Sequence, residues 1–93
     1  SKLAIITGAD GGMGTEITRA VAQAGYHVIM LCYTLFKGEE RKNQLILETG
    51  NKEIEVRQVD LSSMASVTNI AEDLLGRGKH IDLLMNNAGV PEV

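Results

Sequence analysis

Four short apolar segments alternate along this chain with three longer segments in which apolar residues recur at helical spacing. The apolar segments cover residues 3–6, 27–32, 54–59 and 81–85. Three of them lack the apolar–polar alternation of a half-exposed strand, which predicts strands buried on both faces, as in a parallel sheet. The resulting order β-α-β-α-β-α-β constrains the chain to an α/β fold.

The three intervening segments predict helices, and each is followed by a glycine that can end it. The predicted ranges are 12–24, 38–49 and 62–75, followed by Gly25, Gly50 and Gly76. The first helix is expected to pack on the sheet through the apolar residues Ile17, Ala20, Val21 and Ala24.

Right-handed crossovers convert this order into a Rossmann-type parallel sheet with helices on both faces and strand order 3-2-1-4, the first half of a doubly wound fold. Residues 1–93 then form part of a single domain. The first and fourth strands lie side by side, and the connections after them leave to opposite faces. Their carboxyl ends therefore flank the crevice in which open α/β sheets bind ligands.

A glycine-rich loop follows the first predicted strand at this edge. It reads Thr7-Gly8-Ala9-Asp10-Gly11-Gly12-Met13-Gly14. Gly8 permits a tight turn, Gly12 a close approach of the backbone to a phosphate, and Gly14 close packing of the helix. The alternative is an ordinary turn between a strand and a helix. The loop and the helix that follows it predict a pyrophosphate site.

Two further motifs follow the third and fourth predicted strands. Asp60-Leu61 comes after the third, and Asn86-Asn87-Ala88-Gly89 after the fourth. Taken alone, Asp60 is also compatible with a cap of the next helix or its turn. The two asparagines are likewise compatible with a hydrogen-bond hub between neighbouring strands.

With these three motifs at these spacings, the chain resembles the short-chain dehydrogenases/reductases over essentially its whole length. The segments 60–67 and 83–89 look most like the retinol-dehydrogenase-like members. Gly11 also completes a Thr-Gly-x-x-Gly-x-x-Gly pattern, which leaves the extended, epimerase-type branch as an alternative. The Asn-Asn-Ala-Gly motif favours the classical type.

The resemblance implies a nicotinamide dinucleotide as the bound cofactor. The loop backbone would hold its pyrophosphate, through Gly8, Asp10, Gly11, Gly12, Met13 and Gly14. Asp60 would accept a hydrogen bond from the adenine amino group, and Leu61 would pack beside the ring. Residues Asn87, Ala88 and Gly89 would lie along the adenosine ribose and brace the sheet.

The end of the second strand bears on the choice between NAD and NADP. NAD-binding proteins place an acidic residue there, about 20 positions past the loop, to hold the ribose hydroxyls. This chain has Cys32-Tyr33-Thr34 instead, with no acid before Glu39. Retinol-dehydrogenase-like relatives usually carry arginine where Tyr33 stands. The missing acid favours NADP, with Tyr33 and Thr34 as cofactor-binding residues and Thr34 and Lys37 as candidate contacts of the 2′-phosphate. The alternative for Lys37 is a solvated lysine at the start of a helix.

Catalytic residues are not predicted within this chain. In the family, a tyrosine, a lysine and a serine act beyond the Asn-Asn-Ala-Gly strand, past Val93 in this numbering. Tyr33 and Lys37 form a literal Tyr-x-x-x-Lys, but they follow the second strand, at the adenosine end, so we interpret the match as chance. We expect the N-terminal half of an oxidoreductase acting on a small alcohol or carbonyl, inactive by itself. The alternative is a stand-alone nucleotide-binding or interaction module.

Bulk properties exclude several other classes. A net charge of −3 without a cluster of basic residues argues against nucleic-acid binding. The longest apolar run, 28–32, is too short to cross a membrane. The single cysteine, Cys32, fits a reducing compartment, so a cytoplasmic location is expected. His27 and His80 lack partners at metal-ligand spacing, so no metal site is predicted. The open edge of strand 81–85 favours a homo-oligomer.

Overall fold

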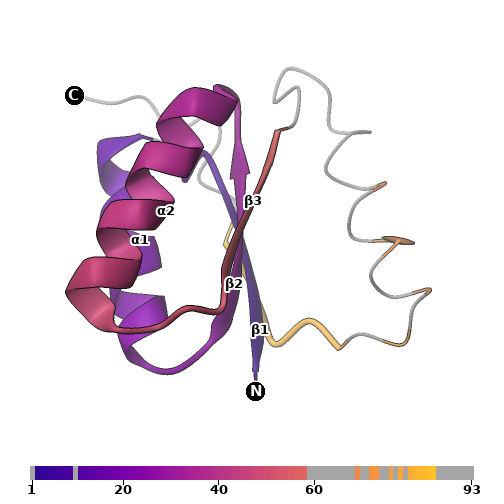
Figure 1. Ribbon diagram of the computed structural model, residues 1–93. Coiled ribbons are helices and arrows are strands. Elements are labelled where there is room, and N and C mark those ends of the chain that lie inside the picture. The colour runs from indigo at the N-terminus through magenta and orange to yellow at the C-terminus, as the bar shows by residue number, and fades with distance from the viewer. Residues whose placement is uncertain are drawn as a thin grey trace.

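A four-stranded parallel sheet in the order β3-β2-β1-β4 forms the centre of the structure (Figure 1). The computed structural model describes residues 2–9, 11–58, 69, 72, 73, 76, 78 and 80–85. Its elements are β1 (Leu3–Thr7), α1 (Gly12–Gln23), β2 (His27–Cys32), α2 (Leu35–Thr49), β3 (Ile54–Gln58) and β4 (Leu83–Met85). The predicted strand order is confirmed. Of the third predicted helix, residues 69, 72 and 73 are described and are helical, and the rest of it and Val59 lie outside the described residues.

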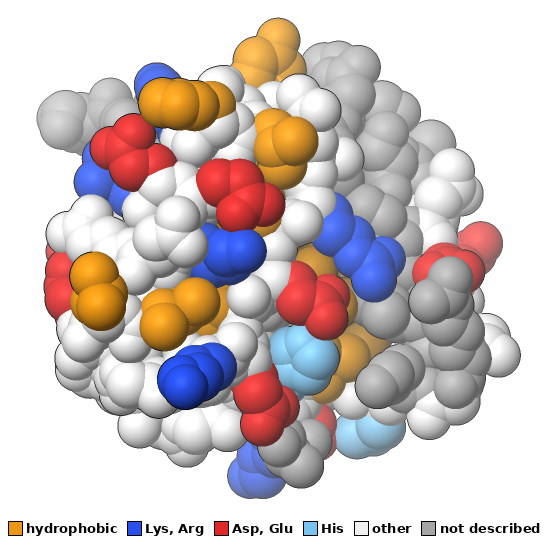
Figure 2. All heavy atoms as spheres, viewed as in Figure 1, with side chains coloured by type: hydrophobic (Ala, Val, Ile, Leu, Met, Phe, Trp, Pro, Cys, Tyr) orange, Lys and Arg blue, Asp and Glu red, His pale blue; other side chains and the backbone are white. Residues whose placement is uncertain are grey.

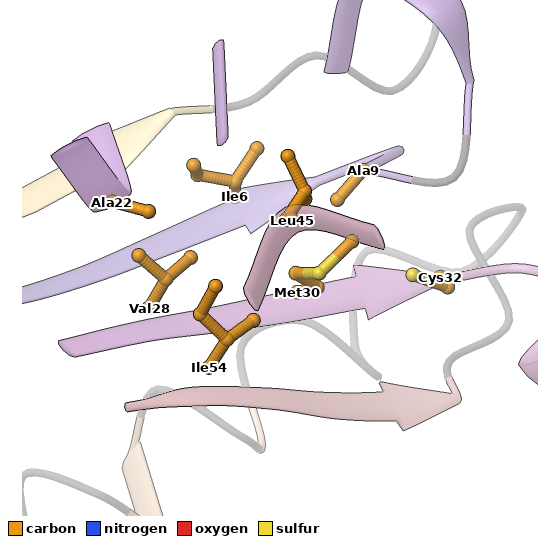
Figure 3. Close-up of a cluster of buried hydrophobic side chains, with 8 residues drawn as sticks. All are labelled: Ile6, Ala9, Ala22, Val28, Met30, Cys32, Leu45 and Ile54. Carbon is orange, nitrogen blue, oxygen red and sulfur yellow. The ribbon is translucent and has the colours of Figure 1, made fainter. Parts of the chain in front are cut away.

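The two central strands are buried on both faces, as their continuous apolar sequence predicts. All five residues of β1 and five of the six in β2 are buried. Because side chains alternate along a strand, two clusters form. The larger one faces α1 and α2 and includes Ile6, Met30 and Leu45 (Figure 3). On the opposite face, Ile5 and Leu31 belong to a smaller cluster.

Helices α1 and α2 cover the same face of the sheet (Figure 1). Helix α1 ends as predicted at Gly25, which has φ 91°. The Gly25 amide donates to Ala22 over 3.0 Å and the Tyr26 amide to Val21 over 3.4 Å, which is the paired hydrogen bonding of a Schellman motif.

The buried face of α1 differs from the prediction. Small residues line it: Gly14, Thr15, Thr18 and Ala22. Ile17 and Val21 are only partly buried, and Ala20 and Ala24 are exposed. Ile17 and Val21 pack against the larger cluster as predicted, and the prediction was wrong for the two alanines. The innermost row holds small residues because α1 approaches the loop closely at Gly14.

Helix α2 begins at Leu35, three residues before the predicted start at Gly38. Gly38 is a buried interior position, and its amide donates to the Thr34 carbonyl over 3.0 Å. A Cβ atom built at Gly38 would lie 2.7 Å from Val56 Cγ1 and 2.8 Å from Cys32 Sγ. This glycine therefore permits close packing of α2 on the sheet and does not mark a helix boundary.

Strand β4 is anchored to β1 at its amino-terminal end. The Asp82 amide donates to the Leu3 carbonyl over 2.9 Å, and the Leu3 amide donates to the Asp82 carboxylate over 2.8 Å. The regular pairing of Ala4 with Leu83 follows directly. The Leu3 amide thus bonds to a side chain and not to a β4 carbonyl, and β4 begins at Leu83, two residues later than predicted.

Acidic and basic side chains are interspersed over α2 and the β3 edge (Figure 2). They include the pair Lys42–Glu39 at 2.9 Å and the pair His27–Glu55 at 3.2 Å. Such charges disfavour the addition of another strand along β3. Within the described residues, no helix combines the length and apolar character that a membrane span needs.

The close packing at Gly38 gives a first prediction. Replacing glycine by alanine inside a helix normally stabilises it by about 1 kcal/mol. At Gly38 we expect the opposite sign, a net loss of about 1 kcal/mol, because overpacking against Val56 and Cys32 costs about 1–3 kcal/mol. Urea unfolding of Gly38→Ala measures the difference, and a raised unfolding midpoint would contradict the packing argument.

Candidate functional site

The loop between β1 and α1 lies at the carboxyl edge of the sheet. Gly8 turns the chain after β1 with φ 62°, a left-handed conformation that side-chain-bearing residues rarely adopt. The Gly11 amide donates to the Gly8 carbonyl over 3.2 Å, and the Ala9 amide to the Leu31 carbonyl over 3.4 Å. The tight turn predicted at Gly8 is therefore present, and the loop is fastened to the end of β2.

Gly14 makes the closest approach of α1 to this loop. A Cβ atom built there would overlap the Gly8 carbonyl oxygen and would lie 2.8 Å from Ala9 Cα. Both contacts are with backbone, which cannot rotate away as a side chain can. The structure thus shows the close packing that the sequence indicates for Gly14.

The first turn of α1 is open to an anion. Gly12 is exposed, and a Cβ atom built on it would meet nothing within 4 Å. No acidic side chain occupies this turn, and the Gly11 cap has no side chain. The amides of Met13 and Gly14 have no carbonyl acceptor four residues earlier in the helix. The positive end of the helix dipole and these N–H groups together attract a phosphate.

The end of β2 carries the predicted ribose residues at the same edge. Tyr33 is 63% exposed, and Thr34 caps α2. Gln58, at the end of β3, donates to the Tyr33 carbonyl over 3.3 Å. Lys37 is exposed in the first turn of α2. The structure therefore brings the glycine loop, Tyr33 and Thr34 to one edge of the sheet.

The remaining predicted site residues cannot be placed. They are Asp10, Asp60, Leu61, Asn87, Ala88 and Gly89, and they lie outside the described residues. The carboxyl end of β4, which precedes residues 86–89 in sequence, does lie beside the loop. The Thr7 hydroxyl donates to the Met85 carbonyl over 3.4 Å. The adenine and ribose roles of these residues stay predictions.

Sequence reasoning missed two buried threonines of α1. The Thr15 hydroxyl lies 3.0 Å from the Ala9 carbonyl and 2.7 Å from the Gly11 carbonyl, and the Thr18 hydroxyl lies 2.8 Å from the Gly14 carbonyl. The available signal was their spacing, because each follows a motif glycine by four residues, where a hydroxyl can bond to the helix backbone.

The charged groups with shifted pKa values lie between α1 and α2. Arg19 bonds to Glu16 and, over 2.7 Å, to Glu48. These bonds, Glu16 first, raise the pKa of Arg19, and the bond from Arg19 lowers the pKa of Glu48. In the part of the chain that the structure describes, no three His, Cys, Asp or Glu side chains are grouped to hold a metal ion.

Comparison with known proteins identifies the family of this chain. The family model for short chain dehydrogenase matches residues 2–93. Retinol dehydrogenase 11 of Mus musculus is 42% identical over 89 residues, which cover 96% of this chain and 28% of that protein. Retinol dehydrogenase 12 of Homo sapiens is 38% identical over the same shares. The chain thus spans little more than a quarter of these relatives.

Solved structures show the same fold. Menthone neomenthol reductase from Mentha piperita superposes with a TM-score of 0.82 at 31% identity, over 97% of this chain and 32% of that one. A metagenomic short-chain oxidoreductase in complex with NADP superposes with a TM-score of 0.82 at 28% identity, over 96% and 39%. The chain belongs to the short-chain dehydrogenase family and is similar to its retinol dehydrogenases.

The contrast between two loop glycines gives a second prediction. Gly14→Ala is expected to lower the free energy of unfolding by about 2 kcal/mol, because the new methyl group meets fixed backbone. Gly12→Ala serves as the matched control and is expected to change it by less than about 0.5 kcal/mol or to raise it. Chemical denaturation measures the free energy of unfolding of both variants, and equal decreases would contradict the packing role of Gly14.

Proposed function

We propose that this chain forms the dinucleotide-binding part of an NAD(P)-dependent oxidoreductase that acts on a small alcohol or carbonyl compound. The observation that carries the proposal is the open first turn of α1. Gly14 seats this turn against the loop, and Gly12 leaves its outer side clear. Membership of the short-chain dehydrogenase family supports the same reading.

The residues present fit a nicotinamide dinucleotide. A cradle made of exposed Gly12 and the first-turn amides suits a pyrophosphate, because it supplies N–H donors and the first turn of α1 contains no acidic residue. Tyr33 and Thr34 lie at the same edge, where the adenosine ribose would be held. When bound, the cofactor would accept a hydride from an alcohol or donate one to a carbonyl, and the task of this chain is to bind and orient it.

We infer a preference for NADP over NAD from the end of β2. No acidic residue occurs between Cys32 and Gly38. The first acid, Glu39, lies inside α2 and is paired with Lys42 at 2.9 Å. A 2′-phosphate would therefore meet exposed Tyr33, Thr34 and the first turn of α2, with no carboxylate from this segment to repel it.

The substrate proposal draws on the relatives, since this chain holds no predicted catalytic residue. Its similarity to proteins named retinol dehydrogenase favours an alcohol or its aldehyde. A cytoplasmic location and a homo-oligomeric state stay predictions. Cys32, a single buried cysteine, is compatible with the location.

The first experiment tests dinucleotide binding in the protein expressed from its complete gene. Gly12→Asp places a carboxylate at the open helix terminus, so we expect binding of the dinucleotide to weaken at least about tenfold through charge repulsion. The fold is expected to remain as stable, because an acidic residue at this end favours the helix. Fluorescence or calorimetric titration measures the affinity.

Gly12→Asn is the matched control, since it adds nearly the same volume without the charge. A smaller loss for asparagine than for aspartate supports an anion site. No binding by the unsubstituted protein, or no effect of Gly12→Asp, would refute the proposal.

The cofactor preference has its own test. Tyr33→Asp supplies the missing carboxylate on an exposed side chain, and we expect the ratio of NADPH to NADH affinity to fall by roughly tenfold or more at fixed ionic strength. Tyr33→Asn controls for loss of the ring. Tighter binding of NADH by the unsubstituted protein would overturn the preference.

A further inference from the structure

Thr15 has a buried hydroxyl that reaches both its own helix and the loop before it. The residue is 5% exposed, in the first turns of α1. Its Oγ1 lies 2.7 Å from the Gly11 carbonyl oxygen and 3.0 Å from the Ala9 carbonyl oxygen. Because a hydroxyl has a single proton, it donates to one of these carbonyls at a time or shares the proton between them.

The two bonds differ in kind. The bond to Gly11 is the ordinary contact of a helical threonine with the carbonyl four residues earlier. Thr18 makes the same contact with Gly14 at 2.8 Å. The bond to Ala9 leaves the helix, because Ala9 precedes α1 and belongs to the glycine loop. Of these bonds, the one from Thr15 to Ala9 reaches past the N-cap residue Gly11 to the loop backbone six residues earlier.

The carbonyl of Ala9 needs this partner because the residue is fully buried. A buried carbonyl without a hydrogen bond is unfavourable, and a peptide in that state tends to rotate toward another donor or water. The neighbouring carbonyls are held by protein groups in a similar way. The Gly8 carbonyl accepts from the Gly11 amide and the Gly11 carbonyl from the Thr15 amide, over 3.2 Å and 2.9 Å.

We propose that Thr15 is a positioning residue of the dinucleotide site. Its hydroxyl holds the Ala9 carbonyl against α1, so that this oxygen, like those of Gly8 and Gly11, is bonded within the protein. A pyrophosphate would then meet the amides of the helix terminus and not these three carbonyl oxygens. This inference rests on the proposed function. It assigns a contribution to dinucleotide affinity to Thr15, a residue outside the glycine motif.

The test compares four variants in the protein from the complete gene. Thr15→Val keeps the shape and removes the hydroxyl, and Thr15→Ala does so with a smaller side chain that cannot clash. Thr15→Ser restores the hydroxyl. Thr18→Val is the matched control, because it removes a buried hydroxyl whose hydrogen bond stays within α1 and does not reach the backbone before the helix.

We expect Thr15→Val and Thr15→Ala to bind NADPH about tenfold more weakly, and Thr15→Ser and Thr18→Val to stay within about twofold of the unsubstituted protein. The melting temperature is expected to fall by similar amounts in Thr15→Val and Thr18→Val, since each variant loses a buried hydroxyl and its hydrogen bonding. In steady-state assays KM for the cofactor rises with little change in kcat.

Equal affinity losses in Thr15→Val and Thr18→Val, or unchanged affinity in Thr15→Val and Thr15→Ala, would overturn the positioning role. A failure of serine to restore binding would do the same. Absence of NADPH and NADH binding by the unsubstituted protein is a separate result, which overturns the proposed function itself.

Discussion

The backbone contact between Gly14 and Gly8 is the constraint from which the site follows. It sets how closely α1 approaches the end of β1, and no side chain can occupy the gap. Once α1 is seated there, its row of small residues must face inward and its first turn must open at the sheet edge. The anion-attracting end of the helix is therefore a product of backbone packing.

The opposite end of α1 is fixed by different interactions. Asn51, in the connection between α2 and β3, donates through its side chain to the Ala22 carbonyl over 3.0 Å and the Tyr26 carbonyl over 2.7 Å. Arg19 bridges to α2 through Glu48. The helix is thus held along its length by polar contacts far from the loop, so that changes in the loop need not release it.

The strands and their order were predictable because they depend on a coarse property, continuous apolar sequence in segments such as 27–32. The loop was predictable because the tight turn at Gly8 and the close helix contact at Gly14 both need glycine, and glycine is visible in the sequence. The inner face of α1 was not, since Thr15 and Thr18 are polar and their burial depends on hydrogen bonds that only the folded loop supplies. Gly38 was misread for a similar reason. A helix boundary and a tight helix–sheet contact both select glycine, and the sequence alone does not distinguish them.

Because α2 packs so closely on the sheet at Gly38, the side-chain volumes allowed at Gly38, Cys32 and Val56 depend on one another. Three segments distant in sequence, the end of β2, the start of α2 and the middle of β3, share one small space. In evolution these positions are therefore expected to vary together. A methyl group gained on the helix is tolerated where a relative has given up a comparable volume on one of the strands. The same coupling transmits any shift of β3 to the start of α2, and so to the segment that we propose as the binding region for the adenosine end of the cofactor.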